Sequence, residues 1–126
     1  MLLRRWSAFL SILALAACVA VPVDRATLQP LAVQGPDVRV ERDAVVHLST
    51  GRNRRIAQGT RWRPVGTLPQ GTVYQPVDSV FIIAGRQIHE AYLVVRDGAL
   101  QGFYLPGESN FSPLSPSLSL HLGATR

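Results

Sequence analysis

The sequence predicts an all-β fold: a small antiparallel meander that bends into a sheet or a partly open barrel of SH3 or OB size. Three observations support this prediction. From residue 38 onward, apolar and polar side chains alternate, as they do in strands with one buried face. Asp97-Gly98, a pair that favours type I′ hairpin turns, separates two β-prone runs. After residue 18, no segment has the apolar period of an amphipathic helix.

The first strand, or strand pair, is predicted between residues 38 and 48. Its apolar face consists of Val38, Val40, Ala44, Val46 and Leu48, with Arg42 as the exception. The opposite face consists of Arg39, Glu41, Asp43 and His47. Residues 49–58 are polar and contain glycine, so we expect a loop there.

A hairpin is predicted next, from two β-prone runs, 62–68 and 72–77, that flank the turn signal Pro69-Gln70-Gly71. Pro64 and Pro76 lack the amide hydrogen that a ladder hydrogen bond needs. We therefore expect each of them at a sheet edge, a bulge or a strand end.

Three further strands are predicted as a meander, at residues 79–84, 88–96 and 99–105. Gly85-Arg86 forms the first turn. Asp97-Gly98 forms the second, since both central positions of a type I′ turn need a positive φ.

The C-terminal segment, residues 106–126, is rich in serine and proline. Within it, Leu118, Leu120 and Leu122 alternate with polar residues, which predicts a last strand. A partly disordered tail is the alternative. The β-domain is therefore expected to cover residues 37–122.

The composition indicates one globular domain. The chain has 126 residues, of which 47% are hydrophobic and 17% are charged, with 13 basic and 8 acidic side chains. This balance argues against a disordered chain, a coiled coil, a multidomain enzyme and a polytopic membrane protein. The single cysteine excludes an internal disulfide and a zinc site made of several thiolates.

The N-terminus has the pattern of a secretory signal. Arg4 and Arg5 precede an apolar stretch, residues 6–17, which is shorter than the roughly 20 residues of a spanning helix. The stretch leads into Leu15-Ala16-Ala17-Cys18. This motif resembles the lipobox of bacterial lipoproteins, in which an aliphatic residue and two small residues precede the cysteine that is acylated.

The lipoprotein resemblance implies a lipid anchor and a cellular location. Residues 1–17 are expected to be a helical signal peptide that is cleaved between Ala17 and Cys18, and acyl chains on Cys18 then hold the protein to a membrane. Val19 follows the cysteine in place of the aspartate that retains such proteins at the inner membrane. The periplasmic face of the outer membrane is therefore expected. Residues 18–36 contain three prolines and are predicted to be a flexible tether.

Five arginines around a tryptophan form a candidate binding patch. The patch consists of Arg52, Arg54, Arg55, Arg61, Trp62 and Arg63. Guanidinium groups bind phosphates and carboxylates through paired hydrogen bonds, and lipopolysaccharide and peptidoglycan offer such anions in the cell envelope. A solvated loop enriched in arginine by GC-rich codons is the alternative, because the chain contains no lysine. No nucleic acid partner is expected for an exported protein.

The remaining residues favour binding over catalysis. Most aromatic side chains are expected in the core, with an exposed Trp62 as the exception. His47, His89 and His121 lack the spacing of a metal site, so we expect no metal, no cofactor and no enzyme activity.

The predicted function is that of a lipid-anchored, non-catalytic binding or assembly module that docks an envelope protein. The alternative is a structural lipoprotein that binds lipopolysaccharide or peptidoglycan through the arginines, and an envelope hydrolase ranks below both.

Overall fold

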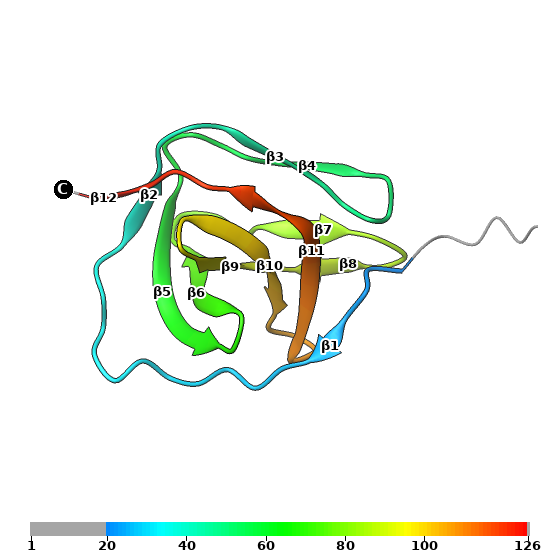
Figure 1. Cartoon of the computed structure of the whole chain (residues 1–126), viewed down its shortest axis with the longest axis horizontal. Coiled ribbons are helices and arrows are strands. Elements are labelled where there is room, and N and C mark those ends of the chain that lie inside the picture. The colour runs from blue at the N-terminus through cyan, green and yellow to red at the C-terminus, as the bar shows by residue number, and fades with distance from the viewer. Residues whose placement is uncertain (1–19, 126) are drawn as a thin grey trace, which may run out of the picture.

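The computed structural model describes residues 20–125, which form an all-β, antiparallel fold (Figure 1). The predicted fold class is confirmed, and no helix occurs in this part of the chain. The predicted signal peptide, with its helix, Ala17 and Cys18, lies outside the described residues. The strands are β1 (Asp24–Arg25), β2 (Val38–Val40), β3 (Ala44–His47), β4 (Asn53–Ile56), β5 (Arg61–Leu68), β6 (Gly71–Pro76), β7 (Ile82–Ala84), β8 (Ile88–Glu90), β9 (Tyr92–Arg96), β10 (Ala99–Leu105), β11 (Asn110–Ser119) and β12 (Leu122–Ala124).

An eight-stranded sheet with the order β1-β11-β10-β9-β6-β5-β2-β12 forms the body of the domain. Every neighbouring pair of strands in it is antiparallel. The sheet curls strongly, because β12 directly follows β11 in the chain and yet pairs with β2 at the far edge. The curled sheet is not closed into a barrel. Two separate hairpins, β3–β4 and β7–β8, complete the fold.

The inner face of the curled sheet carries the larger hydrophobic core. Trp62 and Phe81 meet edge to face there, with ring centroids 5.4 Å apart. Phe81 and Phe103 stack at 6.1 Å. The two hairpins cover these rings, and they bury Ile56 and Ile83 in the same cluster. Aromatic pairs of this kind stabilise a core by roughly 0.5–1.5 kcal/mol beyond the burial of their area.

The outer face of the same sheet carries a smaller cluster. Its buried members are Ala26, Leu68, Val73, Val94, Tyr104 and Phe111. Val73 and Val94 face each other across β6 and β9, and they point away from the inner core because side chains alternate along a strand. An extended segment covers this face, with Ala26 buried and Leu28 packed against the cluster.

This segment belongs to the predicted flexible tether, residues 18–36, and the tether prediction is wrong for its central part. Strand β1 pairs with β11, and the amide of Ala26 donates to the carbonyl of Ser109 at 3.0 Å. Gln29 and Thr67 then exchange two backbone hydrogen bonds of 2.9 and 2.8 Å. The prolines indicated an irregular chain, but the residues between them supply the apolar cover that the outer face needs.

Both predicted hairpins of the main sheet are confirmed. Strands β5 and β6 pair as expected, their register shifts between Pro64 and Gly66, and Pro76 is the last residue of β6. Both prolines therefore lie where their missing amide hydrogen is tolerated. In the β9–β10 turn, φ is +52° at Asp97 and +72° at Gly98, as a type I′ turn requires.

Other features differ from the prediction. The strand expected at residues 79–84 begins only at Ile82, and it pairs with β8 in a separate hairpin, so the predicted three-strand meander is not one continuous sheet. The loop expected at residues 49–58 contains β4, which has three polar residues and one apolar residue, the buried Ile56. The strand expected at residues 88–96 is two strands. The chain passes from the β7–β8 hairpin into the main sheet at the buried Ala91, whose amide donates to the carbonyl of Phe81 at 2.9 Å.

The C-terminal segment forms strands up to Ala124, so the disordered-tail alternative is wrong and the domain continues beyond residue 122. Leu118, Leu120 and Leu122 all pack on the inner core, as their alternation indicated. They do not belong to one strand, however, because β11 ends before Leu120 and β12 begins after it.

Candidate functional site

Three of the predicted patch arginines lie beside a carboxylate of their own. The pairs are Arg55–Asp43 at 3.6 Å, Arg61–Asp78 at 3.0 Å and Arg63–Asp37 at 3.0 Å. The hydrogen bond to Asp37 and its negative charge raise the pKa of the Arg63 guanidinium above its usual value. Each of these guanidinium groups is neutralised locally, and the three do not converge on one anion.

The other two patch arginines lie where the β3–β4 hairpin approaches the β7–β8 hairpin. Arg54 stacks over the Phe81 ring, 4.1 Å from its centroid, and its Nε donates to the carbonyl of Ile82 at 2.8 Å. Arg52 lines a hollow next to Leu48 and Ile82. The structure therefore divides the predicted patch into separate places.

Trp62, predicted to be exposed, is buried, with 2% of its surface accessible. Its Nε1 donates to Thr60 Oγ1 at 3.0 Å, which satisfies the indole N–H inside the core. The cause is the alternation along β5, in which Arg61 and Arg63 point outward and the residue between them points inward. The same period of two identifies Trp62 as a core residue from the sequence.

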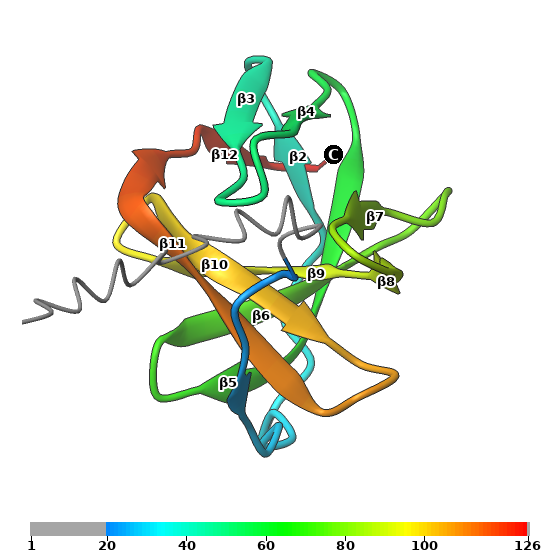
Figure 2. The ribbon, with the colours of Figure 1, turned by 90° about the vertical axis from the view of Figure 1, so that its right-hand side faces the viewer.

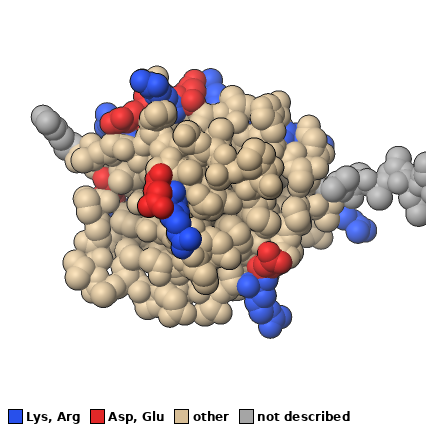
Figure 3. Space-filling view, in the orientation of Figure 1, with Lys and Arg blue, Asp and Glu red and all other residues tan. Residues whose placement is uncertain are grey.

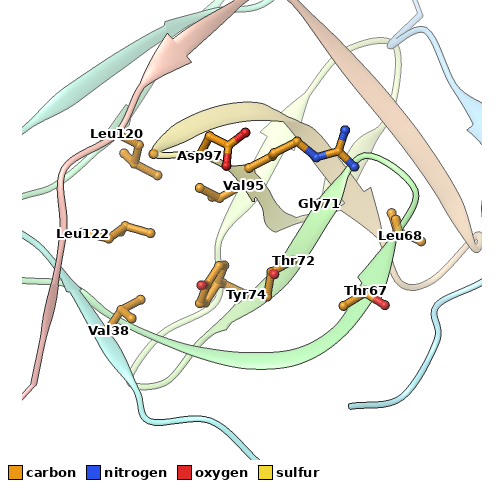
Figure 4. A pocket seen from close by; sticks show the side chains of 12 residues that line it. Val38, Thr67, Leu68, Gly71, Thr72, Tyr74, Val95, Asp97, Leu120 and Leu122 are labelled. Atoms are coloured by element: carbon orange, nitrogen blue, oxygen red, sulfur yellow. The ribbon is translucent and has the colours of Figure 1, made fainter. Parts of the chain in front are cut away.

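A hollow of about 640 Å³ lies where the curled sheet stays open (Figure 4). Side chains from two sides line it, with Thr72, Tyr74 and Val95 on one side and Val38, Leu120 and Leu122 on the other. The first three residues belong to neighbouring strands, β6 and β9. The last three come from β2 and from the chain that follows β11. Sequence reasoning did not identify this hollow, and only the alternating leucines were a signal for one of its walls.

The rim of the hollow is polar. The Arg96 guanidinium donates to the carbonyl of Pro69, and this bond joins the β9–β10 turn to the β5–β6 turn. Burial raises the pKa of the Tyr74 hydroxyl, so this phenol stays neutral at physiological pH and can donate or accept a hydrogen bond. The lining of the hollow therefore combines aliphatic side chains with several polar groups.

The three histidines have different neighbours. His47 Nδ1 lies 2.6 Å from Asn53 Oδ1, His89 Nδ1 lies 3.0 Å from Glu108 Oε1, and His121 connects β11 to β12. In the described part of the chain, no cluster of three or more His, Cys, Asp or Glu side chains is placed to hold a metal ion. Among the same residues, no helix has the length and hydrophobicity to cross a bilayer.

Comparisons with protein-family models, with curated proteins and with solved structures gave no significant match. The fold therefore defines only a broad class, a small all-β domain with a hollow of mixed polar and apolar lining at the open side of its sheet. The N-terminal motif and the geometry of the described residues are the basis for a functional proposal.

Proposed function

We propose that this chain is a lipid-anchored protein of the bacterial cell envelope whose β-domain is a non-catalytic binding or assembly module. Acyl chains on Cys18 hold it at the periplasmic face of the outer membrane after the signal peptide is removed behind Ala17. The anchor is supported by the N-terminal motif, in which the only cysteine of the chain follows Leu15-Ala16-Ala17.

The binding role is supported by the position of the hollow. The described chain begins beside the β7–β8 turn, on the right in Figure 1, whereas the hollow lies among the β5–β6 turn, the β9–β10 turn and β12, on the left. A domain tethered by its N-terminus thus presents the hollow away from the membrane. Strand β12 is also an edge of the sheet, so an extended segment of a partner can pair with it while apolar side chains enter the hollow.

The anchor is tested by mass spectrometry of the membrane fraction. The expected N-terminal peptide begins at Cys18 and carries acyl chains. A Cys18→Ala variant is expected to stay unprocessed or to leave the membrane. An unmodified Cys18 in the wild-type protein contradicts the anchor.

The binding role is tested by crosslinking in intact cells, with a photoreactive benzoylphenylalanine at position 74, where an aromatic residue already lines the hollow. We expect a discrete protein adduct that mass spectrometry identifies. Thr72→Trp fills the hollow and should abolish the adduct, whereas Thr27→Trp, at an exposed position outside the hollow, should leave it unchanged. Adducts with lipopolysaccharide or peptidoglycan alone contradict this role and favour the structural alternative.

A further inference from the structure

We propose that the end of the domain where the described chain begins is a docking surface for the anionic lipid headgroups of the membrane that carries the anchor. This inference rests on the proposed lipid anchor and adds an orientation to it. The surface, called here the anchor-proximal surface, consists of Arg52, Arg54, Ile82, Arg86 and Ile88.

Three segments that are distant in the sequence meet at this end. A methyl group on Gly85, in the β7–β8 turn, would lie 2.6 Å from Val21 Cγ2 and 3.2 Å from Thr50 Cγ2. Thr50, in the β3–β4 turn, donates its hydroxyl to the carbonyl of Ala84 at 3.3 Å. Figure 2 looks onto this end and shows the blue N-terminal segment beginning between the two hairpins.

The anchoring residue is covalently restricted to the same end. Cys18 precedes Ala20 by two residues, so the extended chain allows about 7 Å between their Cα atoms. Acyl chains on Cys18 therefore bring both hairpin tips to the bilayer surface. Charges held there lie within roughly one Debye length, about 8 Å at physiological ionic strength, of the headgroups.

The arginines of this surface are available to anions. Arg52 and Arg86 are exposed, and no ion pair found within residues 20–125 includes either of them. Arg54 donates to a backbone carbonyl and not to a carboxylate. In Figure 3, acidic and basic side chains are mixed at the upper left, whereas the charged atoms in view beside the grey chain are basic.

Two carboxylates lie at this end of the domain. Glu108 lines a hollow together with Arg86, and its Oε1 lies 3.0 Å from His89 Nδ1. Glu90 pairs with Ile82 across the β7–β8 hairpin, so it lies on the same outer face as that residue, at the end of β8 away from the turn. The two turns themselves are positively charged, since residues 48–52 and 85–87 contain Arg52 and Arg86 and no acidic side chain.

The outer face of the β7–β8 hairpin adds apolar side chains to this charge. Ile82 is 40% exposed and Ile88 is 72% exposed, whereas Ile83, on the inner face, is fully buried. Exposed isoleucines next to arginines are the combination that binds a membrane interface, because the apolar groups enter the headgroup layer and the charges bind anionic lipid.

The test uses the full lipidated protein in vesicles, either of phosphatidylcholine alone or with phosphatidylglycerol added. An acylated Cys18 has no free thiol, so one introduced cysteine can be labelled with an environment-sensitive fluorophore. Ile88→Cys is the probe, and Val33→Cys is its matched control. Val33 is 81% exposed and belongs to the β1–β2 connection, which runs along the lower edge and the left side of the domain in Figure 1. We expect the fluorescence emission of a label at position 88 to shift to the blue and to be quenched by nitroxide lipids. A label at position 33 should show neither change.

The expected shift depends on charge. It should appear in vesicles with phosphatidylglycerol, decrease in high salt, and be lost in the Arg52→Ala/Arg86→Ala variant. Equal signals at positions 88 and 33, or equal signals in both kinds of vesicle, overturn the docking surface.

Flotation of the vesicles separates this inference from the proposed function on which it rests. If the protein floats with the vesicles but the label at position 88 shows neither the blue shift nor the quenching, the protein has its anchor and no docking surface. Protein that does not float, and whose Cys18 reacts with a thiol reagent, has neither.

Discussion

The two faces of the curled sheet are buried in different ways. On the inner face, two hairpins close over a cluster that contains Trp62, Phe81 and Phe103. On the outer face, a smaller cluster lies under residues 24–29, called here the strap, which β1 and the Gln29–Thr67 bridge hold in place. One core is thus made by many strands and the other depends on one extended segment. We expect damage to the inner face to unfold the domain, and damage to the outer face to release the strap first.

The largest expected effect tests this difference with the same substitution on each face. Phe103→Ala, at a position 1% exposed in the inner core, should lower the free energy of unfolding by about 3–5 kcal/mol. Phe111→Ala, at a position 4% exposed on the outer face, should cost less, about 2–3 kcal/mol, because the strap can settle into the space. Urea unfolding followed by the fluorescence of Trp62 measures both values. Equal losses, or a larger loss at Phe111, contradict the comparison.

A smaller effect is expected from loosening the strap alone. A methyl group on Gly66 would lie 2.5 Å from the carbonyl oxygen of Gln29 and 2.7 Å from the Leu28 side chain. Gly66→Ala should therefore displace the strap and cost about 1–3 kcal/mol. Hydrogen exchange should show faster exchange at the amides of Gln29 and Thr67 than in the inner strands. Gly107→Ala, where a methyl group meets open space, is the control and should be nearly neutral.

A substitution in the β9–β10 turn should affect both faces together, because these strands contribute to both cores. Gly98 has φ of +72° and no neighbour within 4 Å of an added methyl group, so backbone strain alone opposes a side chain. Gly98→Val should cost about 1–2 kcal/mol, measured in the same urea titration. Gly98→Asn should cost less, since asparagine tolerates positive φ. Indistinguishable values for the two variants contradict the strain explanation.

The smallest effect is expected from an ion pair that belongs to neither core. Arg61→Ala removes the exposed pair with Asp78 and should change the free energy of unfolding by at most about 1 kcal/mol. The difference from wild type should shrink in high salt, since salt screens exposed charges. A larger, salt-independent loss means that the stem of Arg61 contributes through packing.

The fold was predictable where local patterns and tertiary structure agree. Asp97-Gly98 specifies its own turn, and the prolines of β5 and β6 lie at the bulge and the strand end that their missing N–H requires. Strand β4 was missed because three of its residues are polar and Ile56 is its only apolar residue. The strap was missed because its cover of the outer face depends on a partner surface far away in the sequence.

The candidate sites were less predictable than the fold. Arginines that are neighbours in the sequence diverge in space, because Arg61 and Arg63 lie on a strand of the main sheet whereas Arg52 and Arg54 belong to a separate hairpin. The period of two indicated that Trp62 is buried, yet its charged neighbours suggested exposure. The hollow needs the register between β2 and β12, which no local pattern contains.

The pairing of the first strands with the last ones sets the order of events when the chain folds. Strand β1 finds its partner in β11, β2 finds one in β12, and Thr125 donates its hydroxyl to the carbonyl of Asp37 across 88 positions at 3.0 Å. A chain that emerges with its N-terminus first, from a ribosome or through a translocation pore, holds β1 without a partner until nearly all of it has emerged. Such long-range closure is slow compared with local pairing. The complete native state therefore forms only after β12 is free.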